Sequence, residues 1–269
     1  MPTISFPDGS KKIFKSSISP LSIAEEISNS LKKNAVIAKV NGEFWDLNRE
    51  ILEDSDVSIL RKGDKETLEI LRHDCAHILA EAVLEIYPET QVTIGPVIEN
   101  GFYYDFYREE PFSKEDLIII EKRMHEIVDR NERIDREVWS RSDAIKFYED
   151  KNEPFKVELV NNIPKNEELT FYTQGDFIDL CRGPHLRSTL DTGHAFKLMS
   201  VAGAYWRGDS KNPMLQRIYG TAWTTDKELN QYLLMIEEAE KRDHRKIGKA
   251  QKLFHIQEEA TGSIFWHPS

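Results

Sequence analysis

The first sixty residues alternate between short apolar runs and turn residues, a pattern typical of strands arranged around a short helix. Apolar and polar side chains alternate at residues 4–6, and an apolar run at residues 35–40 ends at an Asn-Gly pair, a strong hairpin signal. Between these runs, Pro20 predicts the start of a short helix. With a last strand expected at residues 57–60, the pattern over residues 1–62 predicts a β-grasp unit.

From Asp64 onward the apolar residues follow helical spacing. Asp64 is the expected N-cap of a long helix, and Pro88 is its expected stop. The apolar face of this helix consists of Leu68, Leu71, Cys75, Ile78, Leu79, Ala82 and Ile86. The same spacing predicts an exposed edge made of Asp74, Glu81 and Glu85.

Further helices and strands are predicted along the rest of the chain. Ser113, followed three residues later by Asp116, indicates a capped helix over residues 113–130, and another helix is expected at 225–249. Short strands are predicted at residues 102–106, 156–160, 169–172, 177–180 and 195–199. The predicted fold class is α+β, with a small β-grasp domain at 1–62, a larger α+β domain at 63–224, and a helix within the C-terminal part at 225–269.

The charge and the cysteine content exclude several classes of protein. The 269 residues include 47 acidic and 36 basic side chains, a net charge of −11, so any nucleic acid must be bound by local basic patches. The two cysteines, Cys75 and Cys181, rule out a disulfide framework and fit a reducing compartment. No apolar run approaches the roughly 18 residues of a membrane helix, and no secretory signal is recognisable. We therefore expect a cytoplasmic protein that does not contact a membrane.

Two pairs of residues are the strongest candidates for chemistry. His73 and His77 are four residues apart and so share one helix face, either as ordinary partly buried histidines or as the floor of a cleft. Cys181 and His185 have the same spacing, but Gly183-Pro184 between them prevents a regular helix and predicts a loop after a strand. Taken alone, the second pair fits a buried structural cysteine beside a surface histidine.

Together the two pairs allow more than one kind of site. Three histidines and a cysteine suit tetrahedral zinc. Alternatively, the histidines position water and transfer protons during a hydrolysis. Nothing in the sequence favours Cys181 as a nucleophile over these two readings.

Two further regions could contact RNA. Arginine and aromatic side chains are interleaved at residues 202–209 and 216–223, where they could stack on bases or form a glycine-rich turn with core aromatics. A basic group of Lys241, Arg242, Arg245 and Lys246 stands at a predicted helix C-terminus. It complements the helix dipole there and could also contact phosphate.

Four stretches of the chain, residues 71–77, 94–105, 179–185 and 202–223, resemble the N-terminal half of bacterial threonyl-tRNA synthetases, and the similarity extends over the whole chain. The resemblance implies a TGS domain at 1–62, an editing domain at 63–224 of a type shared with alanyl-tRNA synthetases, and a linker helix. Residues 254–269 resemble the start of the aminoacylation core. We therefore expect a fragment without that core, and the ATP, Mg and Zn of the full enzyme are expected there and not in this chain.

The resemblance also implies a function and a set of site residues. Serine lacks only one methyl group of threonine, which a binding pocket can use for about 1–3 kcal/mol of discrimination. Mischarged seryl-tRNA(Thr) must then be hydrolysed at a separate editing site. The expected catalytic residues are His73, His77, Lys156, Asp179, Cys181 and His185. The expected substrate contacts are Tyr104, Gly95 and Pro96. Lys156 is expected near the developing negative charge and His73 at the terminal ribose, with no metal in the site.

The expected partner is tRNA(Thr), with this chain a monomer and the full enzyme a homodimer. Two other functions remain open at the level of sequence. One is a free-standing zinc hydrolase, because His73, Asp74 and His77 are similar to a metalloprotease helix in which Asp replaces Glu. The other is a non-catalytic RNA-binding module.

Overall fold

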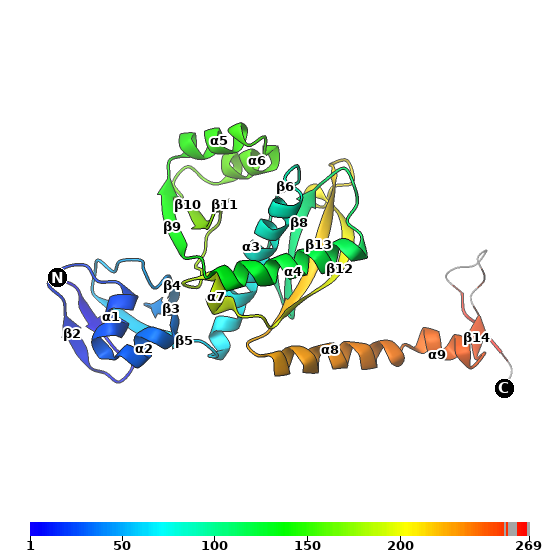
Figure 1. Ribbon diagram of the computed structural model, residues 1–269, viewed down its shortest axis with the longest axis horizontal. Coiled ribbons are helices and arrows are strands. Elements are labelled where there is room, and N and C mark those ends of the chain that lie inside the picture. Colours follow the sequence, from blue (N-terminus) through cyan, green and yellow to red (C-terminus); the bar gives the residue numbers. More distant parts are fainter. Residues whose placement is uncertain (256, 258–262, 268–269) are drawn as a thin grey trace. The chain divides into compact units, whose positions relative to one another are not determined.

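The structure, a computed structural model, describes residues 1–255, 257 and 263–267. It divides into two compact units, residues 1–224 and residues 225–269 (Figure 1). Within the described residues, the helices are all too short or too polar to cross a membrane.

The N-terminal part of the first unit is a five-stranded sheet covered by two helices. Its elements are β1 Thr3–Ser5, β2 Lys11–Ile13, α1 Pro20–Ile27, α2 Asn29–Asn34, β3 Ala35–Val40, β4 Glu43–Trp45 and β5 Ser55–Arg61. The strand order is β2-β1-β5-β3-β4, with β1 and β5 parallel and the other pairs antiparallel. Pro20 is the first residue of α1, and the Ser19 side chain caps it by accepting from the N–H of Ser22. The predicted β-grasp arrangement is confirmed.

The rest of the first unit contains a long helix packed on a second sheet. After a 3₁₀ turn at Lys65–Thr67, α3 spans Leu68–Ile86 and so begins three residues later than predicted, and Asp64 instead accepts from the N–H of Arg61. The sheet has the order β12-β13-β8-β6, with β7 also pairing with β8. Its strands are β6 Gln91–Val92, β7 Val97–Ile98, β8 Gly101–Tyr107, β12 Phe196–Tyr205 and β13 Met214–Ala222.

A second helix, α4 (Lys114–Arg130), lies beside α3 (Figure 1). Its N-terminus carries the predicted capping box, in which Ser113 and Asp116 each bond to the other's backbone N–H. Arg123 and Arg130 of α4 form ion pairs with Glu85 of α3. The two helices and the sheet share one hydrophobic core.

A three-stranded sheet and a helical hairpin complete the first unit. The sheet has the order β11-β10-β9, from β9 Ile134–Trp139, β10 Leu169–Gln174 and β11 Phe177–Leu180. The hairpin consists of α5 Arg141–Asp150 and α6 Pro154–Asn162, and a short α7 follows at Thr189–Thr192. The hairpin packs on β10 through Ala144, Tyr148, Val160, Leu169 and Phe171.

The N-terminal sheet and the α3 layer are joined by buried contacts. Val36 and Ile37 of β3 belong to the same core as the apolar residues of α3. The amide of Lys62 donates to the carbonyl of Asn34, which extends the backbone hydrogen bonds to the residue before Gly63. The boundary at residue 62 stays a prediction within this continuous unit.

The strand predicted at residues 156–160 is wrong, because these residues lie in α6. A short apolar run is ambiguous between strand and helix by its pattern alone. Pro154 favours the helix, because it is the first helical residue. At that position the helix needs no backbone N–H from proline, and the fixed φ of proline suits a helix.

The C-terminal unit contains two helices instead of the single helix predicted at 225–249. These are α8 Asp226–Lys241 and α9 His244–Ala250, followed by the paired strands β14 Phe254–His255 and β15 Phe265–Trp266. The break falls at Asp243, whose carboxylate accepts from the N–H of Arg245 and so competes with helix continuation. Residues 254–269, which resemble the start of an aminoacylation core, lie partly outside the described residues.

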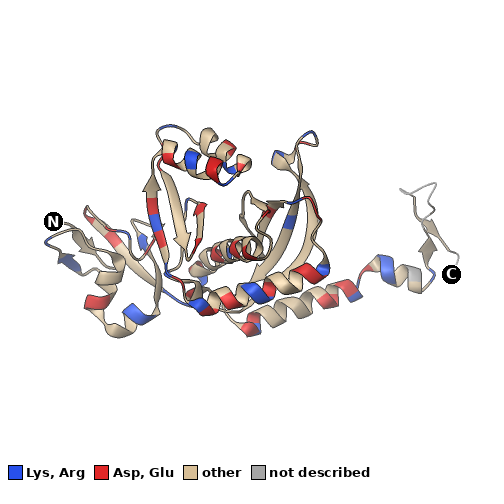
Figure 2. Ribbon diagram, turned by 45° about the horizontal axis from the view of Figure 1, so that its top comes forward, with Lys and Arg blue, Asp and Glu red and all other residues tan. Residues whose placement is uncertain are grey.

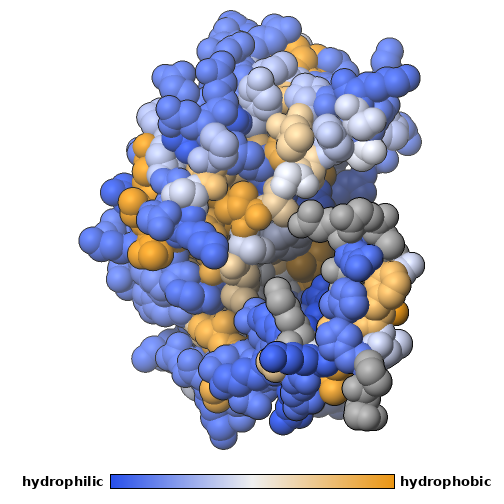
Figure 3. Space-filling model, turned by 90° about the vertical axis from the view of Figure 1, so that its right-hand side faces the viewer, coloured by the Kyte–Doolittle hydropathy of each residue, from blue (hydrophilic) through white to orange (hydrophobic). Residues whose placement is uncertain are grey.

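Surface charge and hydropathy are mixed on both units. Acidic and basic residues both occur along α4 and α8 (Figure 2), and Lys241 pairs with Glu237 and Glu238. Apolar side chains are also exposed on the face shown in Figure 3. In the C-terminal unit the exposed apolar residues include Leu234, Met235 and Trp266.

Candidate functional site

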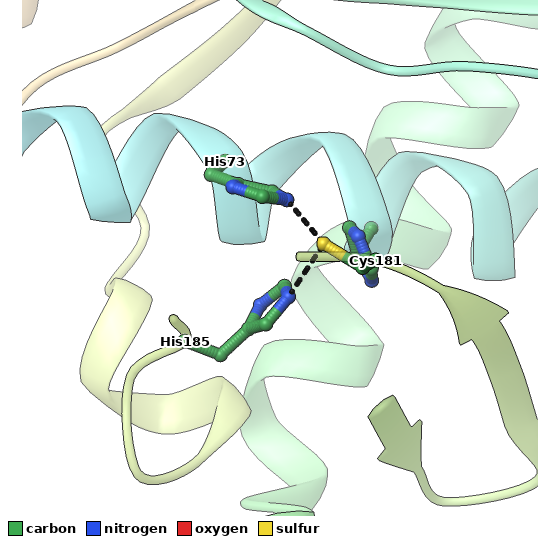
Figure 4. Close-up of side chains that lie close together, drawn as sticks. His73, Cys181 and His185 are labelled. Carbon is green, nitrogen blue, oxygen red and sulfur yellow. Dashed lines mark hydrogen bonds between the residues drawn. The ribbon is translucent and has the colours of Figure 1, made fainter. Parts of the chain in front are cut away.

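The two predicted pairs of residues form one cluster. His73 and His77 project from the same face of α3, with ring centroids 5.1 Å apart. Cys181 follows the end of β11, and His185 lies in the next loop (Figure 4). The Cys181 Sγ is 3.0 Å from His73 Nε2 and 3.3 Å from His185 Nε2. One ligand atom from each of the four residues lies within 4.8 Å of the others.

The loop that carries His185 depends on glycine at position 183. Gly183 has φ +64°, and a Cβ there would lie 2.0 Å from the Oη of Tyr172. No other residue fits both the backbone conformation and this close approach. The N–H of Gly183 donates to the Sγ of Cys181 at 3.2 Å, so the same turn also orients the cysteine.

Asp74 is a member of the site that the sequence pattern assigned wrongly to an exposed edge. Its side chain is fully buried, with Oδ1 2.8 Å from His185 Nδ1 and Oδ2 accepting from the N–H of Leu186 at 3.0 Å. Glu81, expected on the same edge, is also buried and bonds to Gln174. The helical pattern cannot show that a loop 111 residues downstream covers this side of α3.

A second buried polar group lies around Lys156 of α6. Lys156 forms an ion pair with Asp179 of β11, and both side chains are buried. The Oη of Tyr104 donates to Asp179 Oδ2 at 2.8 Å, and the Oη of Tyr148 donates to Oδ1 at 3.2 Å. Lys156 Nζ is also 3.3 Å from the Tyr104 Oη. Three segments far apart in the chain therefore meet at one carboxylate.

The two groups are neighbours, because β11 contributes to both. Asp179 and Cys181 are two residues apart, so their side chains leave the extended chain on the same side. Lys156 also acts on the cluster electrostatically. Burial lowers the pKa of His77 well below its usual value, and His185, His73 and Lys156 add to this shift.

Burial also sets the protonation states of the cluster. It lowers the pKa values of His73 and His185 to about 4, so both imidazoles are neutral at pH 7. It raises the pKa of the Cys181 thiol, which is therefore protonated and a poor nucleophile. It raises the pKa of Asp74 to about 8, so the Asp74–His185 contact is a neutral pair that shares one proton.

Gly95 and Pro96 lie beside Tyr104. A Cβ on Gly95 would be 2.2 Å from the Tyr104 ring, so only glycine lets the backbone approach that ring. The carbonyl of Pro96 accepts from the N–H of Tyr103 at 3.2 Å. The structure thus places both residues against β8 next to Tyr104. Their role as substrate contacts stays a prediction.

In the interleaved stretches 202–209 and 216–223, which were considered for RNA contact, Trp206 and Arg217 make contacts within the chain. Trp206 is buried and its indole N–H donates to Glu158. Arg217 forms a bidentate pair with Asp105 and covers the ring of Tyr103 at 3.8 Å. These contacts indicate that Trp206 is a structural aromatic residue of the core, whereas the ring of Tyr205 is exposed.

Two known domain families match parts of the chain. Residues 2–61 match the TGS domain family. Residues 169–219 match the family described as the threonyl and alanyl tRNA synthetase second additional domain, and this stretch contains Asp179, Cys181 and His185.

Three curated relatives illustrate the similarity over the whole chain. The threonine–tRNA ligase of Gluconacetobacter diazotrophicus is 57% identical over 268 residues, which cover 100% of this chain and 42% of the relative. The threonine–tRNA ligase of Maricaulis maris is 57% identical over 269 residues, which cover 100% of this chain and 42% of the relative. That of Rickettsia akari is 58% identical over 267 residues, which cover 99% of this chain and 42% of the relative. The chain spans about two fifths of the length of these relatives. It thus carries a TGS domain and a second additional domain, and throughout its length it is similar to the N-terminal part of bacterial threonine–tRNA ligases.

Proposed function

We propose that this chain hydrolyses the ester of seryl-tRNA(Thr), as the editing part of a threonine–tRNA ligase. One observation carries the proposal: a cluster of three neutral histidines and a thiol lies beside a buried lysine–aspartate pair. The domain matches support it, because the matched family is named for the two synthetases that carry this domain.

The reaction needs three things that these residues can supply. A water molecule must be held against the ester carbonyl, the oxyanion must be stabilised, and the leaving ribose oxygen must receive a proton. Neutral imidazoles accept hydrogen bonds from water and can take the proton of the attacking water. The partly exposed His73 suits contact with the terminal ribose, whose leaving oxygen receives that proton. The buried charge of Lys156 suits the developing oxyanion, with Asp179 and Tyr104 holding it in place.

Selectivity follows from the size of the amino acid. Threonine adds one methyl group to serine, and a tightly packed pocket has no space for it. Overpacking by one methyl typically costs about 1–3 kcal/mol. The chain should therefore spare correctly charged threonyl-tRNA.

The activity of the complete enzyme is part of the proposal. We infer that the protein attaches threonine to tRNA(Thr) with ATP, using Mg and Zn in a region that these residues do not include. In the same proposal this chain alone is a monomer, and the full enzyme is a homodimer.

The cluster also fits a metal ion. His73, His77, Cys181 and His185 could hold zinc, since their ligand atoms lie within 4.8 Å of one another and are types that zinc accepts. A bound zinc would supply a Lewis acid at this position. We favour hydrolysis without a metal, because four protein ligands would fill a tetrahedral zinc and leave no open position. Lys156 provides the positive charge instead.

Elemental analysis and chelation separate these two readings. The metal-free proposal expects well under one zinc per chain and full deacylation after treatment with a chelator. Stoichiometric zinc, whose removal stops the reaction and whose return restores it, would favour a zinc hydrolase.

The hydrolysis itself is tested by incubating the chain with tRNA(Thr) carrying radiolabelled serine. We expect release of serine well above the spontaneous rate. Binding of the tRNA without release of serine would instead support a non-catalytic RNA-binding module.

A further inference from the structure

An aspartate of the TGS domain reaches the loop that carries His185. Asp46 directly follows β4, and its side chain is largely buried. Its Oδ1 accepts from the backbone N–H of His185 at 3.0 Å, and its Oδ2 accepts from the Oη of Tyr172 at 3.0 Å. One carboxylate thus joins the N-terminal sheet to two residues at the candidate site.

Tyr172 holds the same loop from a second side. It lies on β10, and its ring centroid is 4.3 Å from that of His185. Its hydroxyl is also the group that a Cβ on Gly183 would strike. The position of the Tyr172 hydroxyl, which Asp46 fixes, therefore defines the space available to the turn before His185.

The contacts of His185 divide between two carboxylates from different parts of the chain. Asp74 of α3 contacts the ring Nδ1 and the next amide, that of Leu186. Asp46 binds the amide of His185 itself. Asp74 therefore orients the imidazole, whereas Asp46 holds the backbone from which it projects, and the other ring nitrogen, Nε2, contacts Cys181 Sγ at 3.3 Å.

The support behind Asp46 is rigid. The preceding residue, Trp45, packs in the core of the N-terminal sheet, and Leu47 is buried. Val36 and Ile37 of the same sheet share the core of α3. A carboxylate fixed in this way orders its hydrogen-bond partners at little further entropic cost.

We propose that Asp46 is a positioning residue for the editing reaction, through which the TGS domain completes the site that contains His185. This inference rests on the proposed deacylase function. It assigns the TGS domain a role in the chemical step in addition to any role in binding RNA. Displacing a catalytic group by about 1 Å can lower the rate on the order of 100-fold.

Variants of the full 269-residue chain test the proposal, with single-turnover deacylation of seryl-tRNA(Thr) at saturating enzyme and tRNA affinity measured separately. Asp46→Ala removes both hydrogen bonds, and we expect the saturating rate to fall roughly 10- to 100-fold while affinity changes less than about twofold. Asp46→Asn keeps one acceptor for the His185 amide and should recover much of the rate. Tyr172→Phe keeps the bond between Asp46 and the His185 amide and also keeps the aromatic ring. Its deacylation rate should therefore be closer to wild type than that of Asp46→Ala.

Glu50→Ala is the matched control. Glu50 is an exposed carboxylate four residues away that lines the same cavity of about 310 Å³ as Asp46 and His185, but it bonds to Ser17. The Glu50→Ala substitution removes the same charge as Asp46→Ala and should leave the saturating deacylation rate unchanged. An unchanged saturating rate in Asp46→Ala, or an equal loss in Glu50→Ala, would overturn the proposal.

Amide hydrogen exchange at His185 tests the geometry without relying on activity. We expect protection of this amide to fall in Asp46→Ala and to persist in Asp46→Asn and Glu50→Ala. If protection falls in Asp46→Ala as expected but the wild-type chain does not deacylate seryl-tRNA, the proposed function is contradicted and the structural contact stands. Unchanged protection in Asp46→Ala would contradict the positioning role itself.

Discussion

His73 differs from the other histidines of the cluster in its exposure. His77 and His185 are buried, whereas His73 is partly exposed, with its Nε2 turned toward Cys181. It is therefore the imidazole best placed to meet a substrate that enters from solvent. Because its pKa is about 4, it serves as a hydrogen-bond acceptor at neutral pH.

Replacing His73 tests this assignment. We expect His73→Ala to lower the single-turnover rate of seryl-tRNA deacylation by roughly 10²- to 10⁴-fold, the usual contribution of a positioned acid–base group. The loss of stability should be modest, since the side chain is not fully enclosed. His125→Ala, on the partly exposed side of α4, is the control. A rate within a few-fold of wild type would remove His73 from the site.

The Lys156–Asp179 pair should contribute both to the stability of the fold and to the rate of deacylation. Lys156→Met leaves a buried carboxylate without its cation, and we expect a loss of about 3–5 kcal/mol in the free energy of unfolding. The double variant Lys156→Met/Asp179→Asn removes the unpaired charge and should recover much of that stability, but not the deacylation rate. Denaturant unfolding and single-turnover assays measure the two effects. A double variant no more stable than the single one would contradict this account of the pair.

At the scale of elements, α6 links Lys156 to a second buried carboxylate. Glu153 occupies the N-cap position of α6, and its Oε2 accepts from the N–H of Val92 at 3.2 Å. Burial raises the pKa of Glu153 to about 7, although Lys156 acts in the opposite direction. The folded chain therefore binds one more proton than the unfolded chain between about pH 4.5 and pH 7.

The contribution of Glu153 to stability should consequently fall as pH rises through that window and then level off. Glu153→Gln keeps an acceptor for Val92 but cannot ionise. We expect the wild-type free energy of unfolding, relative to this variant, to decrease by about 3 kcal/mol from pH 4.5 to 7. Urea unfolding of both proteins across the range measures the difference. A difference that is independent of pH would show that Glu153 has an ordinary pKa.

The sequence predicted elements best where the signal is local. The Ser113 and Asp116 capping box and the Asn-Gly hairpin at residues 41–42 depend only on neighbouring residues, and both are present. The strand assigned to residues 156–160 failed, because its apolar run fits a helix equally well until Pro154 is considered. A pattern of apolar spacing also cannot reveal which side of a helix a distant loop covers, and for this reason Asp74 was misplaced.

The candidate site shows the same division between local and distant information. Pairs four residues apart identified His73 and His77, and the Gly183 turn identified the loop of His185. The meeting of α5, α6, β8 and β11 around Asp179 depends on tertiary packing, which spacing does not encode. Asp46 carries no sequence signal, since it acts only through contacts with residues more than 120 positions away.

At the scale of the whole molecule, a net charge of −11 means that the proposed binding of tRNA would have to use local basic groups. The exposed cations at the end of α8 and the start of α9 are partly paired, Lys241 with Glu237 and Arg245 with Asp243. A phosphate contact there would replace an ion pair within the chain. Surface pairs of this kind contribute little stability, so the exchange is feasible.

Neutralising Lys241, Arg242, Arg245 and Lys246 together tests this basic group. We expect the slope of log affinity for tRNA against log salt to decrease by roughly one for each phosphate contact that is lost. Binding titrations over a range of salt concentrations measure the slope. An unchanged slope would exclude the group from tRNA binding.

The most direct test of the account compares two esters of one tRNA. Single-turnover deacylation rates are measured for seryl-tRNA(Thr) and threonyl-tRNA(Thr), with wild-type chain and with His73→Ala. We predict that the wild type hydrolyses the seryl ester about 10- to 200-fold faster than the threonyl ester, the range that one methyl group allows, and that His73→Ala lowers the seryl rate by roughly 10²- to 10⁴-fold. Equal rates for the two esters with the wild type, or a seryl rate in His73→Ala within a few-fold of wild type, would contradict the account.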